Sequence, residues 1–92
     1  MKLGTFSQQV RERFSYTITY EDDLTAGDNV KETTVLVEPV GLIVDDVGVF
    51  NPRVRFWTTG GVSGVTYTVT FLTTTEDGAT FEDEVVFKIK DI

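Results

Sequence analysis

Alternation of apolar and polar residues with a period of two is the dominant pattern in this sequence. From Phe14 to Tyr20, aromatic and aliphatic residues alternate with serine and threonine. A period of two places one side of a β-strand in a core and the other side in solvent. The same alternation recurs in residues 53–59 and 65–75, so the pattern predicts strands in all three segments.

Composition and turn signals predict the remaining strands. Threonine and valine fill residues 30–38, and a last strand is predicted from about residue 80. Two shorter apolar segments, 42–44 and 47–50, are predicted as separate strands. The turn signals between segments are Gly27-Asp28, Pro39 with Gly41, Asn51-Pro52, Gly60-Gly61 and Asp77-Gly78. About seven short strands with turns every 8 to 12 residues predict an all-β, immunoglobulin-like antiparallel β-sandwich.

Residues 1–13 lack this alternation. They hold Gln8, Gln9 and Arg11 among scattered apolar residues. We therefore predict two parts, an N-terminal arm over residues 1–13 and an immunoglobulin-like sandwich domain over residues 14–92. The arm either docks on a neighbouring protein or frays, as untethered termini commonly do.

Composition excludes several classes of function. The 92 residues suit one domain, and they include neither cysteine nor histidine. Disulfide frameworks, thiolate metal sites and the commonest general base are therefore ruled out. The formal charge of -7 has the wrong sign for a phosphate backbone. Because no apolar run fits a signal peptide or a membrane span, we expect no nucleic-acid or membrane partner and synthesis in the cytoplasm.

The candidate chemical motifs are weak. Glu21-Asp22-Asp23 with Asp28 and, separately, Asp45-Asp46 offer oxygen ligands for calcium, but without EF-hand spacing; the alternative is solvated loop carboxylates. The serines have no histidine to activate them. The glycines of residues 60–64 precede a strand, which predicts a tight turn and not a phosphate loop. We therefore expect no enzyme activity, no cofactor and no metal.

Two aromatic residues have alternative roles. Tyr67 follows a turn at the start of a strand, where it is either a corner tyrosine bonded to the backbone or an ordinary core residue. Trp57 is out of phase with Val54 and Phe56, so it points to the opposite face, as a lid on a second sheet or as an interface anchor. The residues predicted for a protein interface are Trp57, Arg55, Arg53, Gln8, Gln9 and Arg11.

A set of residues along most of the chain matches a known family pattern, most specifically from Trp57 to Thr70. The matching residues are Tyr16-Thr17-Ile18-Thr19-Tyr20, Leu24, Gly27-Asp28, Pro39, Gly41-Leu42, Trp57, Gly60-Gly61, Gly64, Tyr67-Thr68-Val69-Thr70 and Thr73-Thr74 through Gly78. From Phe14 to Ile92 the chain resembles the small immunoglobulin-like virion proteins of tailed bacteriophages called fiber-tail adaptors. It departs from them at Asp23, where the family usually has tryptophan, and around residues 45–51.

The resemblance implies a non-enzymatic structural protein of the virion. Its expected role is a tail-associated adaptor that links fibers or neighbouring tail proteins to the tail, in multiple copies within a symmetric assembly. One alternative is a decoration or cement protein on the capsid. Another is a carbohydrate-binding module in which Trp57 and Tyr20 stack on sugars and the acidic loops hold calcium.

Overall fold

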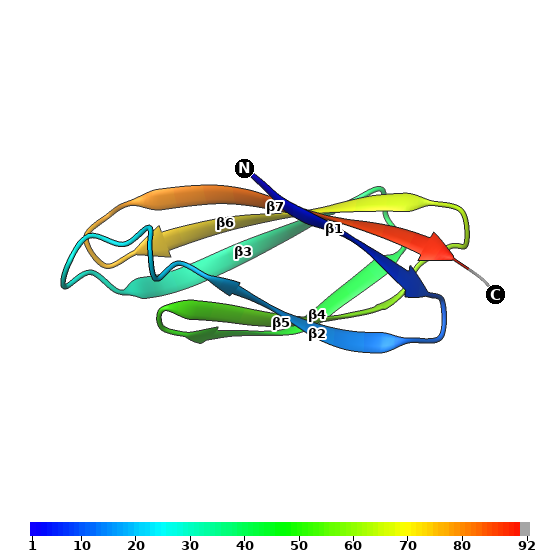
Figure 1. Ribbon diagram of the computed structural model, residues 1–92, viewed down its shortest axis with the longest axis horizontal. Helices are drawn as coiled ribbons and strands as arrows, with labels where there is room; N and C mark the ends of the chain where they lie inside the picture. Colours follow the sequence, from blue (N-terminus) through cyan, green and yellow to red (C-terminus); the bar gives the residue numbers. More distant parts are fainter. Residues whose placement is uncertain (91–92) are drawn as a thin grey trace.

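Seven β-strands in two sheets form an elongated sandwich. The structure, a computed structural model, describes residues 1–90, which include no helix and therefore no helix that could span a membrane. The strands are β1 (Lys2–Gln9), β2 (Arg13–Thr19), β3 (Val30–Glu38), β4 (Leu42–Phe50), β5 (Arg53–Gly60), β6 (Thr66–Thr75) and β7 (Thr80–Lys90). One sheet has the order β1-β7-β6-β3 and the other β2-β5-β4, over extents of 46 × 19 × 19 Å (Figure 1). The prediction of an all-β sandwich is confirmed.

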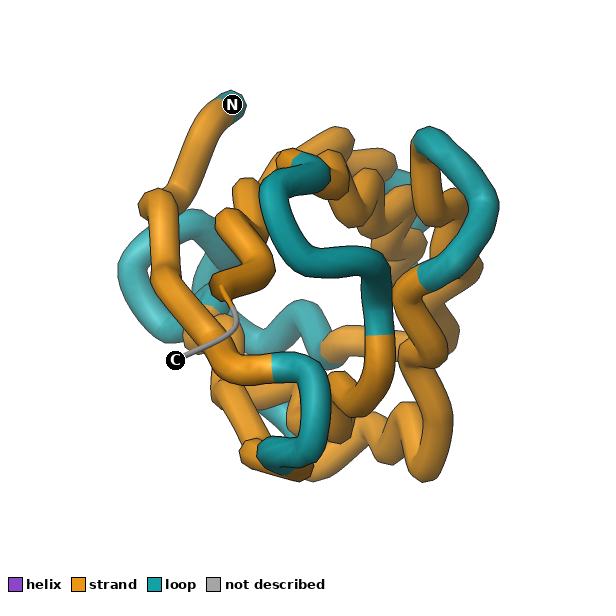
Figure 2. Tube along the Cα trace, turned by 90° about the vertical axis from the view of Figure 1, so that its right-hand side faces the viewer, coloured by secondary structure: helices purple, strands orange, loops and turns teal. Residues whose placement is uncertain are grey.

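The strand order resembles that of immunoglobulin domains, with one difference. In the constant-type arrangement, strands A, B, E and D form one sheet and strands C, F and G the other. Here β2-β5-β4 corresponds to B-E-D, and β7-β6-β3 corresponds to G-F-C. The first strand, however, pairs in parallel with β7 of the opposite sheet instead of with β2. Figure 2, an end-on view, shows the strands of both layers and the loops that connect them.

The N-terminal segment differs from the prediction of a separate arm. Lys2–Gln9 form β1, whose register runs along β7 from Glu84 to Lys90, and Arg13 already begins β2. The sequence pattern does not predict this strand, because the polar residue Gln8 occupies an inward position and interrupts the apolar alternation. Residues 91 and 92 of the predicted domain lie outside the described residues. Docking of this segment on a neighbour stays a prediction.

The predicted division of residues 42–50 into two strands is also corrected. Leu42–Phe50 form the single strand β4, whose pairing with β5 is irregular between Asp45 and Gly48. Asp46 there has a φ of 48°, in the left-handed region. A β-bulge places extra residues opposite one partner and breaks the alternation of faces, which is why the sequence suggested two pieces.

Aromatic rings from both sheets meet in the core. Phe56 of β5 lies 4.6 Å from Phe71 of β6 between ring centroids, and Tyr16 of β2 lies 5.1 Å from Phe87 of β7. Phe56, Phe71 and Phe87 are fully buried. Because each contact crosses from the three-stranded to the four-stranded sheet, these rings hold the two layers together.

Tyr67 is a corner tyrosine, as one of the two alternatives predicted. Its ring is buried, and its hydroxyl accepts a hydrogen bond from the backbone N–H of Val62 at 2.9 Å. Glycine is required next to it, since a Cβ at Gly41 would lie 2.7 Å from this hydroxyl. A Cβ at Gly61 would lie 2.8 Å from Ile89. These glycines therefore make room for the tyrosine at this end of the sandwich.

At the opposite end, Asp28 ties two loops together. Its Oδ1 accepts hydrogen bonds from the backbone N–H groups of Asn29 at 2.8 Å and Asp77 at 3.1 Å. The carboxylate thus links the β2–β3 connection to the β6–β7 hairpin. Hydrogen bonding from the Thr75 hydroxyl, and then from these two N–H groups, lowers the pKa of Asp28, although desolvation opposes the shift.

We expect Phe71→Ala to lower the free energy of unfolding by about 3 to 5 kcal/mol, because it leaves a cavity between the two sheets. The matched control is Leu72→Ala. Leu72 is the next residue on β6 but points outward and is 42% exposed, so its loss should cost about 1 kcal/mol or less. Urea denaturation of the three proteins measures the difference. Equal losses for the two variants would contradict the described core.

We expect the pH dependence of stability to contain a contribution from Asp28. Its pKa is lower in the folded than in the unfolded chain, so the stabilisation is present above the unfolded pKa and is lost as pH falls through the folded pKa. Asp28→Asn should therefore lower the urea midpoint at pH 7 and flatten its decline below about pH 5. The exposed Asp22→Asn in the same loop is the control. Superimposable pH profiles for Asp28→Asn and the unmodified protein would refute the role of this carboxylate.

Candidate protein interface

The outer face of the β2-β5-β4 sheet combines aromatic and arginine side chains. We call it the three-stranded face. Its members used below are Arg13, Ile43, Asp45, Phe50, Arg53, Arg55 and Trp57. On β5, Arg53, Arg55 and Trp57 alternate with the buried Val54 and Phe56. Because side chains alternate between the two faces of a strand, these three point outward. In the register, Trp57 lies opposite Ser15 of β2 and Asp45 of β4.

Trp57 lies partly exposed on the three-stranded face under an arginine. The guanidinium carbon of Arg13 lies 4.3 Å from the centroid of the Trp57 ring. The same guanidinium contacts the carboxylate of Asp45 at 3.1 Å and that of Asp46 at 2.8 Å. The bulge in β4 thus brings both carboxylates to one arginine, which is held over the indole by charge and by cation–π attraction.

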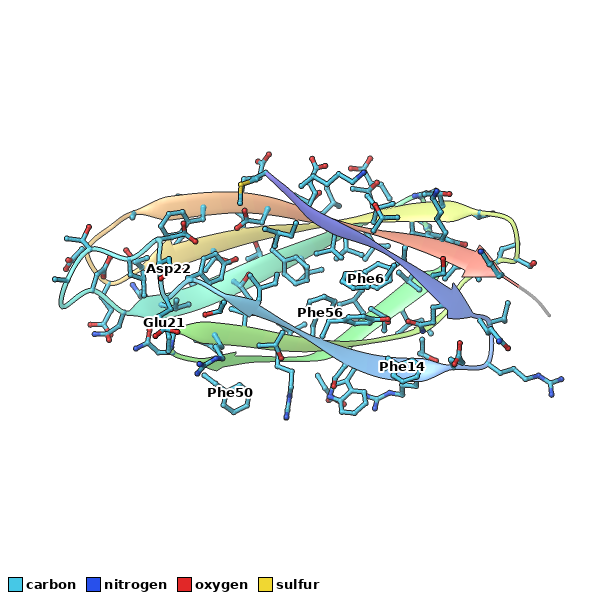
Figure 3. The ribbon with its side chains drawn as sticks, in the orientation of Figure 1. Phe6, Phe14, Glu21, Asp22, Phe50 and Phe56 are labelled. Carbon is cyan, nitrogen blue, oxygen red and sulfur yellow. The ribbon has the colours of Figure 1, made fainter. Side chains whose placement is uncertain are left out.

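Phe50 and Arg55 form a second stack on the same face. The guanidinium carbon of Arg55 lies 5.2 Å from the centroid of Phe50, whose side chain is 57% exposed and points away from the sheet (Figure 3). Arg53 lies 3.8 Å from Glu21. Within residues 1–90, no ion pair involves Arg55. Its charge is therefore available to a partner.

The predicted interface residues separate into two groups. Arg53, Arg55 and Trp57 do lie together on the three-stranded face. Gln9 and Arg11 lie where β1 passes into β2, with Arg11 exposed. For Gln8 the structure corrects the prediction, because its side chain is 2% exposed and belongs to the interior. Contact of any of the others with a partner stays a prediction.

Four of the seven members of this face were not predicted from the sequence, namely Arg13, Ile43, Asp45 and Phe50. Arg13 stands in the outward phase of the alternation that begins at Phe14, which could have placed it beside Trp57. The sequence places Phe50, just before the Asn51-Pro52 turn, in an edge strand, but it does not indicate which face of the sheet the side chain lies on. Only the bulge of β4 decides that Phe50 faces outward, and a bulge leaves no clear trace in the sequence.

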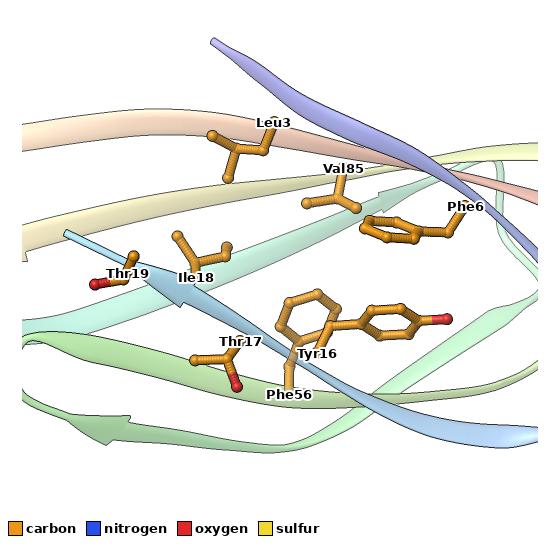
Figure 4. A pocket seen from close by; sticks show the side chains of 8 residues that line it. All are labelled: Leu3, Phe6, Tyr16, Thr17, Ile18, Thr19, Phe56 and Val85. Atoms are coloured by element: carbon orange, nitrogen blue, oxygen red, sulfur yellow. The ribbon is translucent and has the colours of Figure 1, made fainter.

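A groove between β1 and β2 is a second candidate site. It has a volume of about 270 Å³, and its lining comes from both strands and from the core behind them (Figure 4). The lining residues are Leu3, Phe6, Tyr16, Thr17, Ile18, Thr19, Phe56 and Val85. Burial, and to a lesser degree the Glu12 carboxylate, raises the pKa of Tyr16 above its usual value. Because Leu3 and Phe6 were assigned to an arm, sequence analysis did not foresee this groove.

The structure does not assemble the groups proposed for sugar or calcium binding. Tyr20 is 1% exposed, and its hydroxyl shares a 2.9 Å hydrogen bond with that of Thr73. Burial raises the pKa of Tyr20 to about 12. The prediction that Tyr20 stacks on a sugar is therefore wrong. In the part of the chain that the structure describes, no three acidic side chains converge on a point that could hold a metal ion.

Comparison with known proteins gives one match that covers most of the chain. The comparison with curated proteins finds no match. The family described as "Podophage GP4 fiber-tail adaptor protein gp77" matches residues 8–88, from the end of β1 into β7. This range contains the whole three-stranded face and every buried hydrophobic residue of the core except Ile89. It agrees with the resemblance noted in the sequence between Phe14 and Ile92. The chain therefore belongs to the podophage GP4 fiber-tail adaptor protein gp77 family.

Proposed function

We propose that this virion-associated structural protein joins fibers or neighbouring tail proteins to the phage tail, and that it holds them on the three-stranded face. Family membership supports an adaptor that contacts other tail or fiber proteins. The single observation that carries the choice of surface is the pair of arginine–aromatic stacks on this face, Arg13 over Trp57 and Arg55 over Phe50. The side chains of this face are suited to binding a partner, since they include no nucleophile with an adjacent base.

The composition of the face supports an interface. Tryptophan and arginine are enriched among the residues that dominate binding energy at protein interfaces. Three of the four arginines of the chain lie here, namely Arg13, Arg53 and Arg55, although the protein as a whole carries a charge of -7. Ile43, 53% exposed, adds apolar surface beside them. A partner with carboxylates and apolar side chains complements such a face.

The geometry of the face supports affinity as well. Trp57 and Arg55 project from β5, the central strand, which is paired on both sides by β2 and β4. A partner therefore meets side chains on a rigid support, and less conformational entropy is lost on binding. The stacks with Phe50 and Arg13 restrict the same side chains before the partner arrives.

We expect Arg55→Ala to weaken attachment of the partner about 10- to 100-fold, because it removes a charge and a stacking surface at the centre of the face. Lys88→Ala is the control, since Lys88 is exposed on the opposite sheet. Fiber content of particles made with each variant, by electron microscopy and quantitative mass spectrometry, is the measurement. Thermal unfolding checks that both variants fold. Full fiber content with Arg55→Ala would remove the three-stranded face from the proposal.

Deletion of the gene tests the role itself. We expect particles with assembled heads and tails that lack fibers, and about a dozen copies of this chain per normal particle, as tail symmetry requires. Counting copies by quantitative mass spectrometry separates this role from capsid decoration, for which hundreds of copies are expected. Normally fibered deletion particles, or hundreds of copies, would overturn the adaptor role.

A further inference from the structure

The edge of β2 that faces away from β5 has no partner in residues 1–90. In the constant-type immunoglobulin arrangement, the first strand covers this edge. Here β1 pairs with β7 of the other sheet, so the position of that strand beside β2 is vacant. The unpaired backbone runs along Arg13–Thr19 and presents N–H and C=O groups to solvent.

β2 also lacks the features by which edge strands avoid pairing. The other three edge strands carry irregular registers, at Lys2/Gly4 in β1, at Val30/Glu32 in β3 and at Asp45/Gly48 in β4. β2 keeps a continuous register with β5 and contains no proline, glycine or lysine. Bulges, proline and charged residues, lysine above all, are the usual protections of an edge, and the one charged residue of β2, Arg13, stands at its first position. β2 is therefore the one edge strand of the described sheets that is suited to accept another strand.

The groove lies directly beside this edge. Leu3 and Phe6 of β1 border it and are 39% and 42% exposed, while Ile18 and Val85 lie deeper (Figure 4). Its volume of about 270 Å³ lies below the roughly 300 to 1,000 Å³ of small-molecule pockets. An apolar groove of this size next to a free strand edge suits a side chain of an added strand, in which alternate residues point into the protein.

The end of the groove is acidic. Thr19 lines it, and the backbone N–H of Glu21 donates to the Thr19 hydroxyl at 3.3 Å. Asp22 and Asp23 follow at once, and Figure 3 shows Glu21 and Asp22 where β2 ends. All three acidic side chains are exposed. Of these, only Glu21 has an ion-pair partner within the described residues, Arg53. An approaching segment with basic residues is favoured over an acidic one.

We propose that the groove between β1 and β2 receives an extended segment of a partner protein. The segment adds to the free edge of β2 as a strand, places a large apolar side chain between Leu3 and Ile18, and sets basic residues against the carboxylates of residues 21–23. Main-chain hydrogen bonds supply affinity and the groove supplies selectivity. The inference deepens the proposed function, on which it rests for the presence of a partner in the particle.

Cross-linking from the groove identifies the occupant. The chain has no cysteine, so Leu3→Cys, at the exposed border of the groove, gives a unique attachment point for a benzophenone maleimide, and Thr34→Cys, exposed on β3, is the matched control. In assembled particles we expect Leu3→Cys to cross-link to an extended, basic segment of a different tail or fiber protein, with no such product from Thr34→Cys. A product consisting of two copies of this chain, or equal products from both positions, would overturn the proposal.

Hydrogen exchange separates this proposal from the proposed function. In assembled particles, the alternate amides of Arg13–Thr19 that point away from β5 should exchange at least about tenfold more slowly than in the purified protein, because an added strand bonds them. Unchanged exchange along β2 in particles that carry fibers refutes the groove as a docking site and leaves the adaptor role standing. The opposite outcome is also informative. If exchange along β2 is slowed but particles made without the gene still carry fibers, the adaptor role is refuted and the groove is still occupied.

Discussion

The buried side chain of Gln8 joins the two sheets at the point where the chain passes from one to the other. Its amide nitrogen donates to the backbone carbonyls of Thr58 at 3.1 Å and Glu12 at 3.0 Å, and its oxygen accepts hydrogen bonds from the hydroxyls of Thr58 at 2.7 Å and Tyr16 at 3.2 Å. A buried amide is tolerated only when its polar atoms are paired, so this network holds the end of β1 in one position. The network thus connects the end of β1, which pairs with β7, to β2 and β5 of the other sheet.

The placement of β1 determines which surfaces remain open. Because β1 completes the four-stranded sheet, β2 is an edge strand of the other sheet. The two strands diverge from the turn at Val10 to Glu12 (Figure 1). The groove lies between them. Pairing of β1 with β7 therefore leaves a strand edge exposed, and Gln8 connects the end of β1 to the other sheet. The three-stranded face on β5 is formed independently of both by simple alternation.

Much of the architecture could be predicted from local pattern. Alternation in residues 14–20, 53–59 and 65–75 identified β2, β5 and β6, and the Asp77-Gly78 step identified the hairpin that leads to β7. The outward direction of Trp57 followed from its phase relative to Phe56. These features were predictable because the period of a strand and the φ of a turn glycine are properties of a few neighbouring residues.

Contacts between distant segments decided the rest. The sequence by itself determined a sandwich of short strands and an arginine–tryptophan row on one of them. Alternation with Ile18 already placed Tyr20 on the core side of its strand. Only the tertiary structure decided that residues 2–9 are a strand and that Gln8 is internal, because their partners lie far away in the chain. The groove has the same origin: Leu3 and Ile18 become neighbours only through pairing of β1 with β7, a long-range choice that no local period encodes.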